Sequence, residues 1–235
     1  MTPIDLGALA PSPPAPLVAE RVSGLRRRIA AGGRDPATVR IVAVTKGFGL
    51  GAVDAALAAG LSDLGENRAE ELLAKAGARP GAPGAGPVAR WHYLGAIQRR
   101  RVPALAAVVG MWETVARLEE GVAIAAHAPG AAVLVQVDPV AAPGHNGCAL
   151  EEAPALVDGL QALDLDVRGL MVLAPQGPAD SVRHVMRAVA QAGSALGLDE
   201  LSMGMTDDVD LAIAEGATII RIGRGLFGER PPPSR

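Results

Sequence analysis

The sequence predicts a single (β/α)8 barrel, or TIM barrel, with one extra helix at its N-terminus. After one leading helix, a short apolar stretch followed by a helical stretch recurs eight times. Parallel strands joined by right-handed helical crossovers close naturally into a barrel at this number. The length of 235 residues suits one such domain, and a hydrophobic content of 49% can fill its core. An open doubly wound sheet is the alternative architecture, and the count of eight units favours the barrel.

The elements follow from local patterns. A helix is expected over residues 17–31, where apolar residues recur at helical spacing and Gly32-Gly33 ends the pattern. The first strand contains four apolar residues, three of them β-branched, from Ile41 to Val44, and it ends on Lys46. The remaining strands are expected over residues 62–65, 91–94, 109–112, 132–137, 167–173, 200–203 and 218–222. The connecting helices are expected over residues 50–59, 68–76, 114–126, 151–163, 178–196 and 206–215, with another ending near residue 108 and a helical turn at 223–227.

Both ends of the chain are expected to lie outside the barrel domain, which is placed at residues 17–230. Residues 1–16 contain five prolines and no basic residue, which is typical of a disordered segment and not of a secretory signal peptide. Residues 231–235 are expected to form a loose tail. Stretches rich in glycine and proline at 77–87 and 138–147 are expected to be surface loops.

Composition excludes several classes of function. A net charge of −3 gives no indication of a nucleic-acid or membrane partner. No apolar run approaches the ~18 residues of a membrane span. Cys148 is the only cysteine, so an intramolecular disulfide is impossible and a cytoplasmic location is expected. The four histidines lack the spacing of metal ligands, so no metal is expected. The protein is also expected to be a monomer.

Lys46 is the first candidate for chemistry. It stands at the end of a buried strand, and Gly47, Gly49 and Gly51 make room beside it. Of the 22 basic residues only Lys46 and Lys75 are lysines, and an arginine cannot replace a lysine in forming an imine. A strand-end lysine that extends its ammonium to solvent is the alternative.

An anion site is predicted near the last two strands, because ligands of such barrels bind at the carboxyl ends of strands. Gly223-Arg224-Gly225 follows the last strand, and its backbone N–H groups can converge on a phosphate. Thr206 adds a hydroxyl on the same side. An amine and a phosphate site facing one cavity suit an aldehyde that carries a phosphate, namely pyridoxal 5′-phosphate (PLP), bound to Lys46 as a Schiff base. The alternatives are that the glycine turn only allows close packing, and that Thr206 only caps a helix.

Several separated motifs together resemble the YggS/PROSC family of PLP homeostasis proteins. The resemblance extends from about residue 17 to residue 230. The motifs are Ala43-Val-Thr-Lys46, Asp63-Leu-Gly-Glu-Asn67, Trp91-His-Tyr-Leu-Gly-Ala-Ile-Gln98, Arg168-Gly-Leu-Met171, Leu201-Ser-Met-Gly-Met-Thr-Asp-Asp208 and Ile220-Arg-Ile-Gly-Arg-Gly-Leu-Phe-Gly228. The resemblance implies a fold-type III PLP barrel similar to the N-terminal domain of alanine racemase.

The resemblance also implies roles for individual residues. Lys46 matches the lysine that forms the Schiff base. Arg221 matches the arginine that faces the pyridine nitrogen. The phosphate would be bound by Thr206, where the family usually has serine, and by the backbone of Gly223 and Arg224. Asn67 and Met203 would line the cofactor pocket.

The predicted function is to hold PLP and to buffer it or deliver it to PLP-dependent apoenzymes, without strong catalysis. A permanently charged guanidinium beside the ring nitrogen weakens the ring as an electron sink. No acid–base pair is visible around Lys46, and the single tyrosine, Tyr93, falls on a predicted strand. The rival function is a PLP-dependent racemase or lyase acting on amino acids, and a third is a PLP-free barrel that binds phosphorylated sugars. Lys75 is expected to be dispensable for PLP binding.

Overall fold

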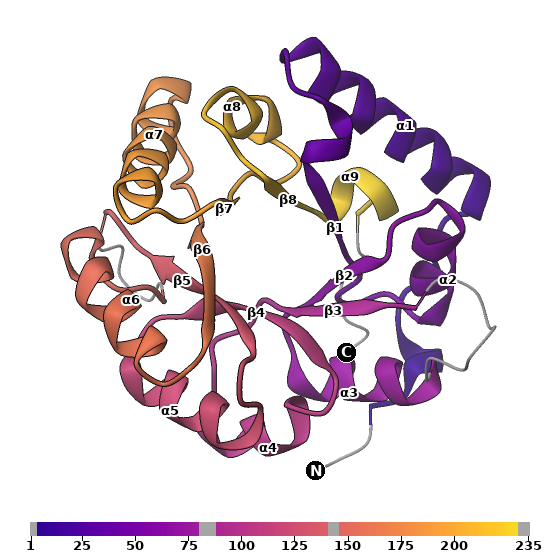
Figure 1. The fold of residues 1–235 in the computed structure, drawn as a ribbon. Helices are drawn as coiled ribbons and strands as arrows, with labels where there is room; N and C mark the ends of the chain where they lie inside the picture. The colour runs from indigo at the N-terminus through magenta and orange to yellow at the C-terminus, as the bar shows by residue number, and fades with distance from the viewer. Residues whose placement is uncertain (1–3, 80–87, 141–145, 230–235) are drawn as a thin grey trace.

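The chain forms a closed barrel of eight parallel strands with helices around it (Figure 1). The computed structural model describes residues 4–79, 88–140 and 146–229. Each strand pairs with the next in chain order, and β8 pairs with β1 to close the ring, so the predicted fold class is confirmed. The strands are β1 (Arg40–Val44), β2 (Asp63–Glu66), β3 (Arg90–Tyr93), β4 (Val109–Val115), β5 (Ala132–Val137), β6 (Asp166–Val172), β7 (Glu200–Ser202) and β8 (Ile219–Ile222).

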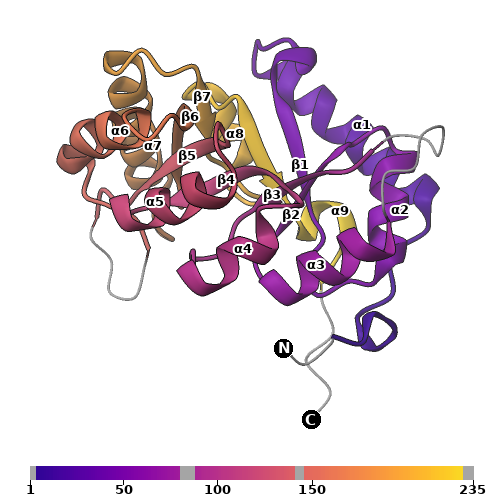
Figure 2. The ribbon, with the colours of Figure 1, turned by 60° about the horizontal axis from the view of Figure 1, so that its bottom comes forward.

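Helices lie outside the ring, and α1 (Ala15–Ala31) precedes β1 as the predicted extra helix. Figure 2 shows the same arrangement from a second direction. The other α-helices are α2 (Leu50–Ala58), α3 (Ala69–Ala78), α4 (Val102–Leu105), α5 (Leu118–His127), α6 (Ala153–Gln161), α7 (Ala179–Ala195), α8 (Val209–Ala214) and α9 (Arg224–Phe227). Short 3-10 helices occur at η1 (Leu6–Ala8), η2 (Pro36–Thr38), η3 (Arg99–Arg101) and η4 (Leu150–Glu152).

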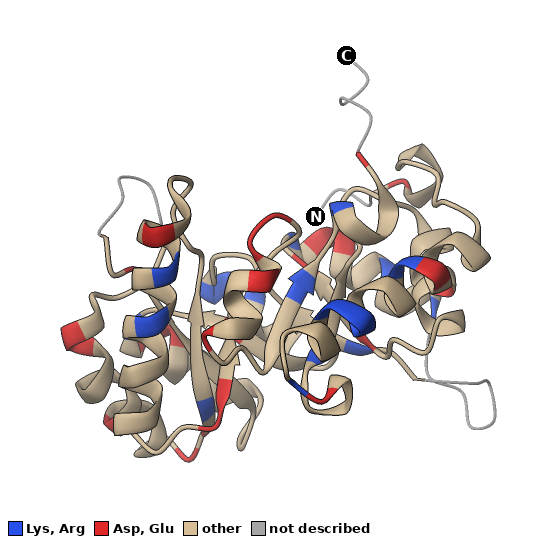
Figure 3. Ribbon diagram, turned by 90° about the horizontal axis from the view of Figure 1, so that it is seen from above, with Lys and Arg blue, Asp and Glu red and all other residues tan. Residues whose placement is uncertain are grey.

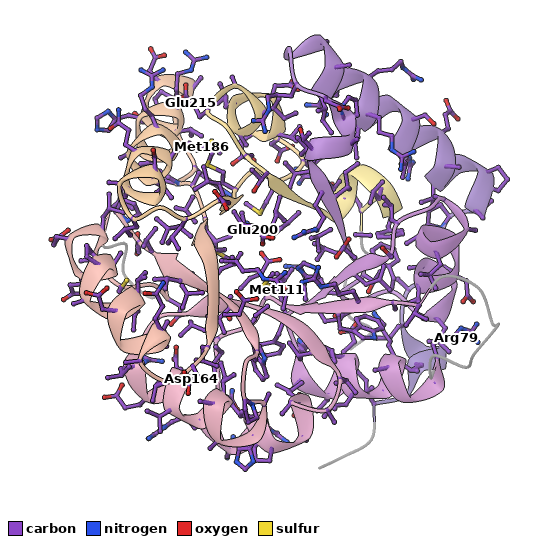
Figure 4. The ribbon with its side chains drawn as sticks, viewed as in Figure 1. Arg79, Met111, Asp164, Met186, Glu200 and Glu215 are labelled. Atoms are coloured by element: carbon purple, nitrogen blue, oxygen red, sulfur yellow. The ribbon has the colours of Figure 1, made fainter. Side chains whose placement is uncertain are left out.

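The strands together contribute side chains to two separate cores, because successive residues of a strand point to opposite faces. The larger core lies between strands and helices and contains Ile41 and Ala43 of β1 together with Val18 and Ile29 of α1. The smaller core lies inside the barrel, where Figure 4 labels Met111. It comprises Val42, Met111, Ala132, Leu134, Met171 and Ile219. Because Val42 faces inward, the alternation assigns Lys46, four residues later, to the interior.

Strand β4 is longer than the sequence predicts, and the helix after it starts later. A helix was expected from residue 114, but Thr114 and Val115 are buried and belong to β4. The following helix begins at Leu118, where the Glu120 carboxylate accepts a hydrogen bond of 2.8 Å from the Ala116 N–H. That carboxylate satisfies a backbone donor at the helix start, and this determines where the helix begins.

Residues 4–16 differ from the disorder expected of them. They contain the 3-10 helix η1 and run beside the loop that follows Lys46. The Ala10 N–H donates to the Gly47 carbonyl at 3.0 Å, and the Ala10 carbonyl accepts from the Gly49 N–H at 2.9 Å. These two hydrogen bonds hold the segment against the rim of the barrel. Of the loops expected at 77–87 and 138–147, residues 80–87 and 141–145 lie outside the described residues, as does the tail at 231–235. The first of these loops was placed too early, because Gly77 and Ala78 belong to α3.

The charged residues are mixed along the exterior. In the view of Figure 3, acidic and basic positions occur on the same helices. Among the described residues, no helix is both long and apolar enough to cross a membrane.

Candidate functional site

Three neighbouring strands bring predicted site residues together at their carboxyl ends. Strand β1 lies between β2 and β8, with Val44 opposite Gly65 and Ala43 opposite Ile222. Continuing the first register by two residues sets Lys46 beside Asn67. On the other side, a Cβ built on Gly223 would lie 3.3 Å from the Val44 carbonyl oxygen. The site therefore forms where β1, β2 and β8 end.

Lys46 is partly buried, and its two neighbours in the chain are held by helix α3. The Thr45 carbonyl accepts a hydrogen bond of 2.8 Å from Lys75 Nζ. The Gly47 N–H donates to Glu71 Oε1 at 2.5 Å. Lys75 and Glu71 are themselves an ion pair, one helical turn apart, with 2.8 Å between Nζ and Oε1. The backbone on both sides of Lys46 is thus attached to one pair of side chains.

The turn after β8 carries the residues predicted to bind an anion. Thr206 Oγ1 accepts a hydrogen bond of 3.0 Å from the Gly225 N–H. Gly223 and Arg224 stand at the N-cap and first position of α9, where the hydrogen-bond ladder of a helix supplies no acceptor for the N–H groups. A Cβ at residue 225 would approach the Thr206 hydroxyl to 3.3 Å and an Ile222 methyl to 2.9 Å. Glycine is therefore required here so that backbone and hydroxyl can come close together.

The expectation that Thr206 caps the following helix is wrong. That helix, α8, begins at Val209, with Asp208 at the N-cap position. The Asp208 carboxylate accepts from the Met205 N–H at 2.6 Å, which leaves Thr206 in the preceding turn. The hydroxyl of Thr206 faces the end of β8 instead. Asn67 does not occupy the N-cap position of α3 either, because Arg68 stands there.

Arg221 is buried inside the barrel, and each of its two terminal nitrogens donates a hydrogen bond. Its Nη1 donates to Ser202 Oγ at 2.6 Å, and its Nη2 donates to the Val172 carbonyl at 2.8 Å. Ser202 Oγ in turn donates to Glu113 Oε2 at 2.6 Å. Burial lowers the pKa of Arg221, whereas the Glu113 carboxylate opposes that shift. The guanidinium is consequently held in one orientation with a counter-charge one hydroxyl away.

The chain of polar contacts continues across the barrel through His92. Its Nδ1 lies 2.5 Å from Glu113 Oε1 and its Nε2 lies 2.9 Å from Asp63 Oδ1. Burial by itself would lower the pKa of His92, but the hydrogen bonds to Asp63 and Glu113 outweigh it and raise the pKa. Burial would raise the pKa of Glu113, but the hydrogen bonds from His92 and Ser202 and the charges of His92 and Arg221 together outweigh it, and the pKa is lowered. The two carboxylates that flank His92 thus favour its protonated form.

This inner network was missed in the sequence. Its members are separated by 21 and 89 positions along the chain, so no short motif contains them. The available signal was a polar residue at an inward position of each of several strands. Within the described ranges, no group of three His, Cys, Asp or Glu residues is arranged to hold a metal ion.

The other predicted site residues divide into two groups. Asn67 is partly buried at the end of β2 and faces the same rim as Lys46. Met203 is completely buried and packs in the outer core between strands and helices, so its predicted contact with a cofactor gains no support from its position. The Arg224 side chain is exposed and forms ion pairs with Asp207 and Glu229, leaving only its backbone near the turn.

A second buried cluster lies behind the site, on the helix side of the barrel wall. Lys75 Nζ lies 2.5 Å from Glu66 Oε1, and the same oxygen accepts from Thr45 Oγ1 at 2.6 Å. Burial raises the pKa of Glu66 to about 7, although Lys75 opposes the shift. Glu66 Oε2 is buried and has no partner among the described residues. The sequence signal was a glutamate and a lysine four positions apart, at 71 and 75, which usually marks an exposed helix face.

A separate hollow lies at the opposite end of the barrel. It has a volume of about 380 Å³ and is lined by Ala37, Thr38, Arg40, Glu200, Thr218 and Ile219. Arg40 pairs there with Glu200 at 3.3 Å and with Asp63 at 3.9 Å. Charges at the amino-terminal ends of barrel strands generally contribute to stability and not to catalysis. We therefore assign this hollow no part in the site.

Comparison with known proteins identifies the family. Residues 20–231 match the model of the alanine racemase N-terminal domain. The chain is 38% identical over 213 residues to the pyridoxal phosphate homeostasis protein of Deinococcus radiodurans, covering 88% of this chain and 97% of that protein. It is 36% identical to the protein of the same name from Pseudomonas aeruginosa, covering 91% and 94%.

Solved structures agree with this assignment. PipY of Synechococcus elongatus, solved with PLP bound, superposes with a TM-score of 0.78 at 30% identity, covering 90% of this chain and all of that one. A lysine/ornithine decarboxylase of Vibrio vulnificus shares the fold, with a TM-score of 0.67 at 13% identity over 62% of its length. The barrel, its strand-end motifs and these relatives together show that the chain belongs to the family of pyridoxal phosphate homeostasis proteins.

Proposed function

We propose that this chain binds PLP covalently through Lys46 and keeps the cofactor available to PLP-dependent enzymes, without strong catalytic activity of its own. One observation carries the proposal: the strand ends that bear Lys46, Asn67 and the Gly223–Gly225 turn are neighbours in the barrel. An amine and a set of phosphate donors are thereby close enough to serve one small ligand. Membership of the family supplies the identity of that ligand.

The residues at the rim fit PLP at each of its functional groups. Bound PLP supplies an aldehyde that condenses with a lysine amine to give a Schiff base, and Lys46 is the lysine on the inner face. The N–H groups of Gly223 and Arg224, together with the Thr206 hydroxyl, provide donors for the phosphate. Arg221 presents a guanidinium from the inward side of β8 toward the pyridine nitrogen. Asn67 closes the side formed by β2.

The environment of Arg221 supports a protein that stores the cofactor, and not one that uses the cofactor for catalysis. Its guanidinium only donates hydrogen bonds, so it disfavours a protonated ring nitrogen. The ring is then a poor electron sink. Tyr93, the only tyrosine, packs in the outer core with its ring edge on Trp112, at a centroid distance of 5.7 Å. A racemase needs a second acid–base group opposite the lysine, and Tyr93 is on the wrong side of the barrel wall to be one.

The remaining features of the proposal concern the surroundings of the protein. PLP-dependent apoenzymes are the proposed recipients, because a protein that holds a reactive aldehyde without using it must release it to others. We also propose a monomer in the cytoplasm. The single cysteine supports that location, since Cys148 is buried and burial raises the pKa of its thiol to about 11, which makes it unreactive.

Spectroscopy tests the proposal directly. Adding PLP to the purified protein is expected to produce a visible absorbance band, and borohydride is expected to fix the cofactor on a peptide containing Lys46. The variant Lys46→Arg keeps the charge and cannot form the bond, so it is the matched control. A colourless protein without fixed cofactor would favour the phosphorylated-sugar barrel. Rapid exchange of the α-proton of amino acids would favour the racemase or lyase.

A further inference from the structure

Helix α3 carries a buried ion pair, Lys75 and Glu71, close to the backbone of Lys46. Folding alone does not require a charged pair at this position. Lys75 and Glu71 are 0% and 1% exposed, and burying such charges is costly unless each one is paired and hydrogen-bonded. Outer positions of barrel strands and their covering helices are normally apolar, as the rest of the outer core is here. A charged pair at this position therefore calls for an explanation in terms of what it contacts.

Its contacts converge on the two peptide groups that flank Lys46. The Thr45 carbonyl is bonded to Lys75 Nζ at 2.8 Å, and the Gly47 N–H is bonded to Glu71 Oε1 at 2.5 Å. Lys46 is thus the residue between two anchored neighbours. The alternation of the strand, in which Val42 faces inward, assigns Lys46 to the opposite face of the barrel wall from the pair that holds its backbone.

The same pair also connects the end of β1 to the end of β2. Lys75 Nζ lies 2.5 Å from Glu66 Oε1, and Glu66 immediately precedes Asn67. The Gly47 carbonyl is held from the other side by the Ala10 N–H at 3.0 Å. The loop after Lys46 is therefore restrained at its first residue, because both the N–H and the carbonyl of Gly47 are hydrogen-bonded.

We propose that the Lys75–Glu71 pair is a positioning device that fixes the backbone of residues 45–47, and thereby aims the Lys46 amine into the barrel. The inference rests on the proposed function, since the amine is what the pair would position. Lys75 and Glu71 bond to the backbone on either side of Lys46, so they are positioning residues and not catalytic ones. Their effect comes from preorganisation: an amine held in one direction reacts without first losing conformational freedom.

This inference corrects the expectation that Lys75 is dispensable. Covalent fixation is still expected only on Lys46, because Lys75 is fully buried on the other side of the wall. Retention of PLP, however, is expected to depend on Lys75 through the backbone of Lys46. The two lysines thus have different roles in PLP binding: Lys46 forms the covalent bond, and Lys75 holds the backbone of Lys46.

The best variant is Glu71→Met, because it leaves the buried charges balanced. Lys75 keeps its ion pair with Glu66, while the acceptor for the Gly47 N–H is lost. The matched control is Leu72→Ala on the same helix, which removes packing from a fully buried side chain that contacts the outer core. The control is expected to lower the melting temperature at least as much as Glu71→Met.

The readout can be made without any cofactor, because the chain contains only two lysines. With 13Cε-labelled lysine, the NMR spectrum should show one signal for each. We expect the Lys46 signal of Glu71→Met to move toward that of free lysine, and its PLP dissociation constant to rise about tenfold, as for a lost ordering hydrogen bond. Leu72→Ala should change neither.

The opposite result overturns the inference. If Glu71→Met leaves the Lys46 signal and the PLP dissociation constant at wild-type values while its melting temperature falls, the pair serves only the fold. If the wild-type protein binds no PLP, the proposed function fails, and the NMR signal of the cofactor-free protein still decides whether the pair positions Lys46.

Discussion

Two buried ionic clusters lie on opposite faces of the barrel wall, and they differ in what they hold. The inner cluster joins Arg221 to His92 and Asp63 through Ser202 and Glu113, and so links side chains across the barrel. The outer cluster joins Lys75 to Glu71, Glu66 and the Thr45 carbonyl, and so links backbone segments to helix α3. The inner cluster orients the arginine predicted to face the pyridine ring, whereas the outer one holds the backbone around the predicted amine.

The clusters also differ in charge balance. The inner one sets two cations, Arg221 and His92, against two carboxylates whose pKa values are lowered, Glu113 and Asp63. The outer one has a single cation, Lys75, for two carboxylates. The excess acid explains why burial can raise the pKa of Glu66 to about 7. The comparison teaches that a buried cluster with an excess acid contains a carboxyl group whose pKa lies near neutrality, whereas both carboxyl pKa values of the inner cluster are lowered.

The largest expected effect comes from breaking the inner cluster at its centre. Replacing Glu113 by Leu leaves Arg221 and His92 buried without the carboxylate between them, which should lower the free energy of unfolding by about 3–5 kcal/mol. Urea denaturation measures the change. Met111→Leu, on the same strand and face, is the control and should cost less than about 1.5 kcal/mol. Equal losses in the two variants would show that Glu113 contributes only packing.

The next effect sharpens the difference in pH response. The folded-state pKa of Glu66 is raised from 4.5 to about 7, so this group's contribution to stability is fully present below pH 4.5 and is lost as pH rises through 7. Glu66→Gln should therefore gain stability relative to the wild type between pH 5 and pH 8, by about 1–3 kcal/mol. Thermal unfolding across this range measures the difference. If the difference in stability between the wild type and Glu66→Gln does not change with pH, the raised pKa of Glu66 is contradicted.

A smaller effect is expected at Thr206, which belongs to neither cluster. Thr206→Val keeps the shape and removes the acceptor for the Gly225 N–H, at a cost to stability of about 1 kcal/mol. If the hydroxyl also binds phosphate, the dissociation constant of PLP should rise about tenfold. Equilibrium dialysis measures it. Unchanged PLP binding would limit Thr206 to holding the glycine turn.

The smallest effect is expected at Arg224, whose side chain is exposed. Exposed ion pairs such as those with Asp207 and Glu229 contribute little to stability. Arg224→Ala should leave the melting temperature and PLP binding at wild-type values, because only the backbone of this residue lies at the turn. A clear loss of PLP binding in this variant would assign the guanidinium itself to the phosphate site.

Local sequence determined the barrel and most of the residues at its rim. The apolar β-branched run of β1, the alternation of strand and helix patterns, and the glycines after Lys46 and around Arg224 are short-range signals. They predicted seven of the eight strands to within one or two residues at each end. Strand β4 was predicted three residues too short, because Thr114 and Val115 fit a helix pattern as well as a strand until their burial decides.

Only the tertiary structure decided which polar residues meet. Capping was the alternative prediction for Thr206, and the partner of its hydroxyl in the structure, Gly225, is 19 positions away. Local sequence did not distinguish Lys75, because a helical glutamate–lysine pair is usually exposed, and here helix α3 turns that pair against the strand ends. The physical reason is that propensity and pattern act over a few residues, whereas closing the barrel brings distant charges into contact in a place that water cannot reach.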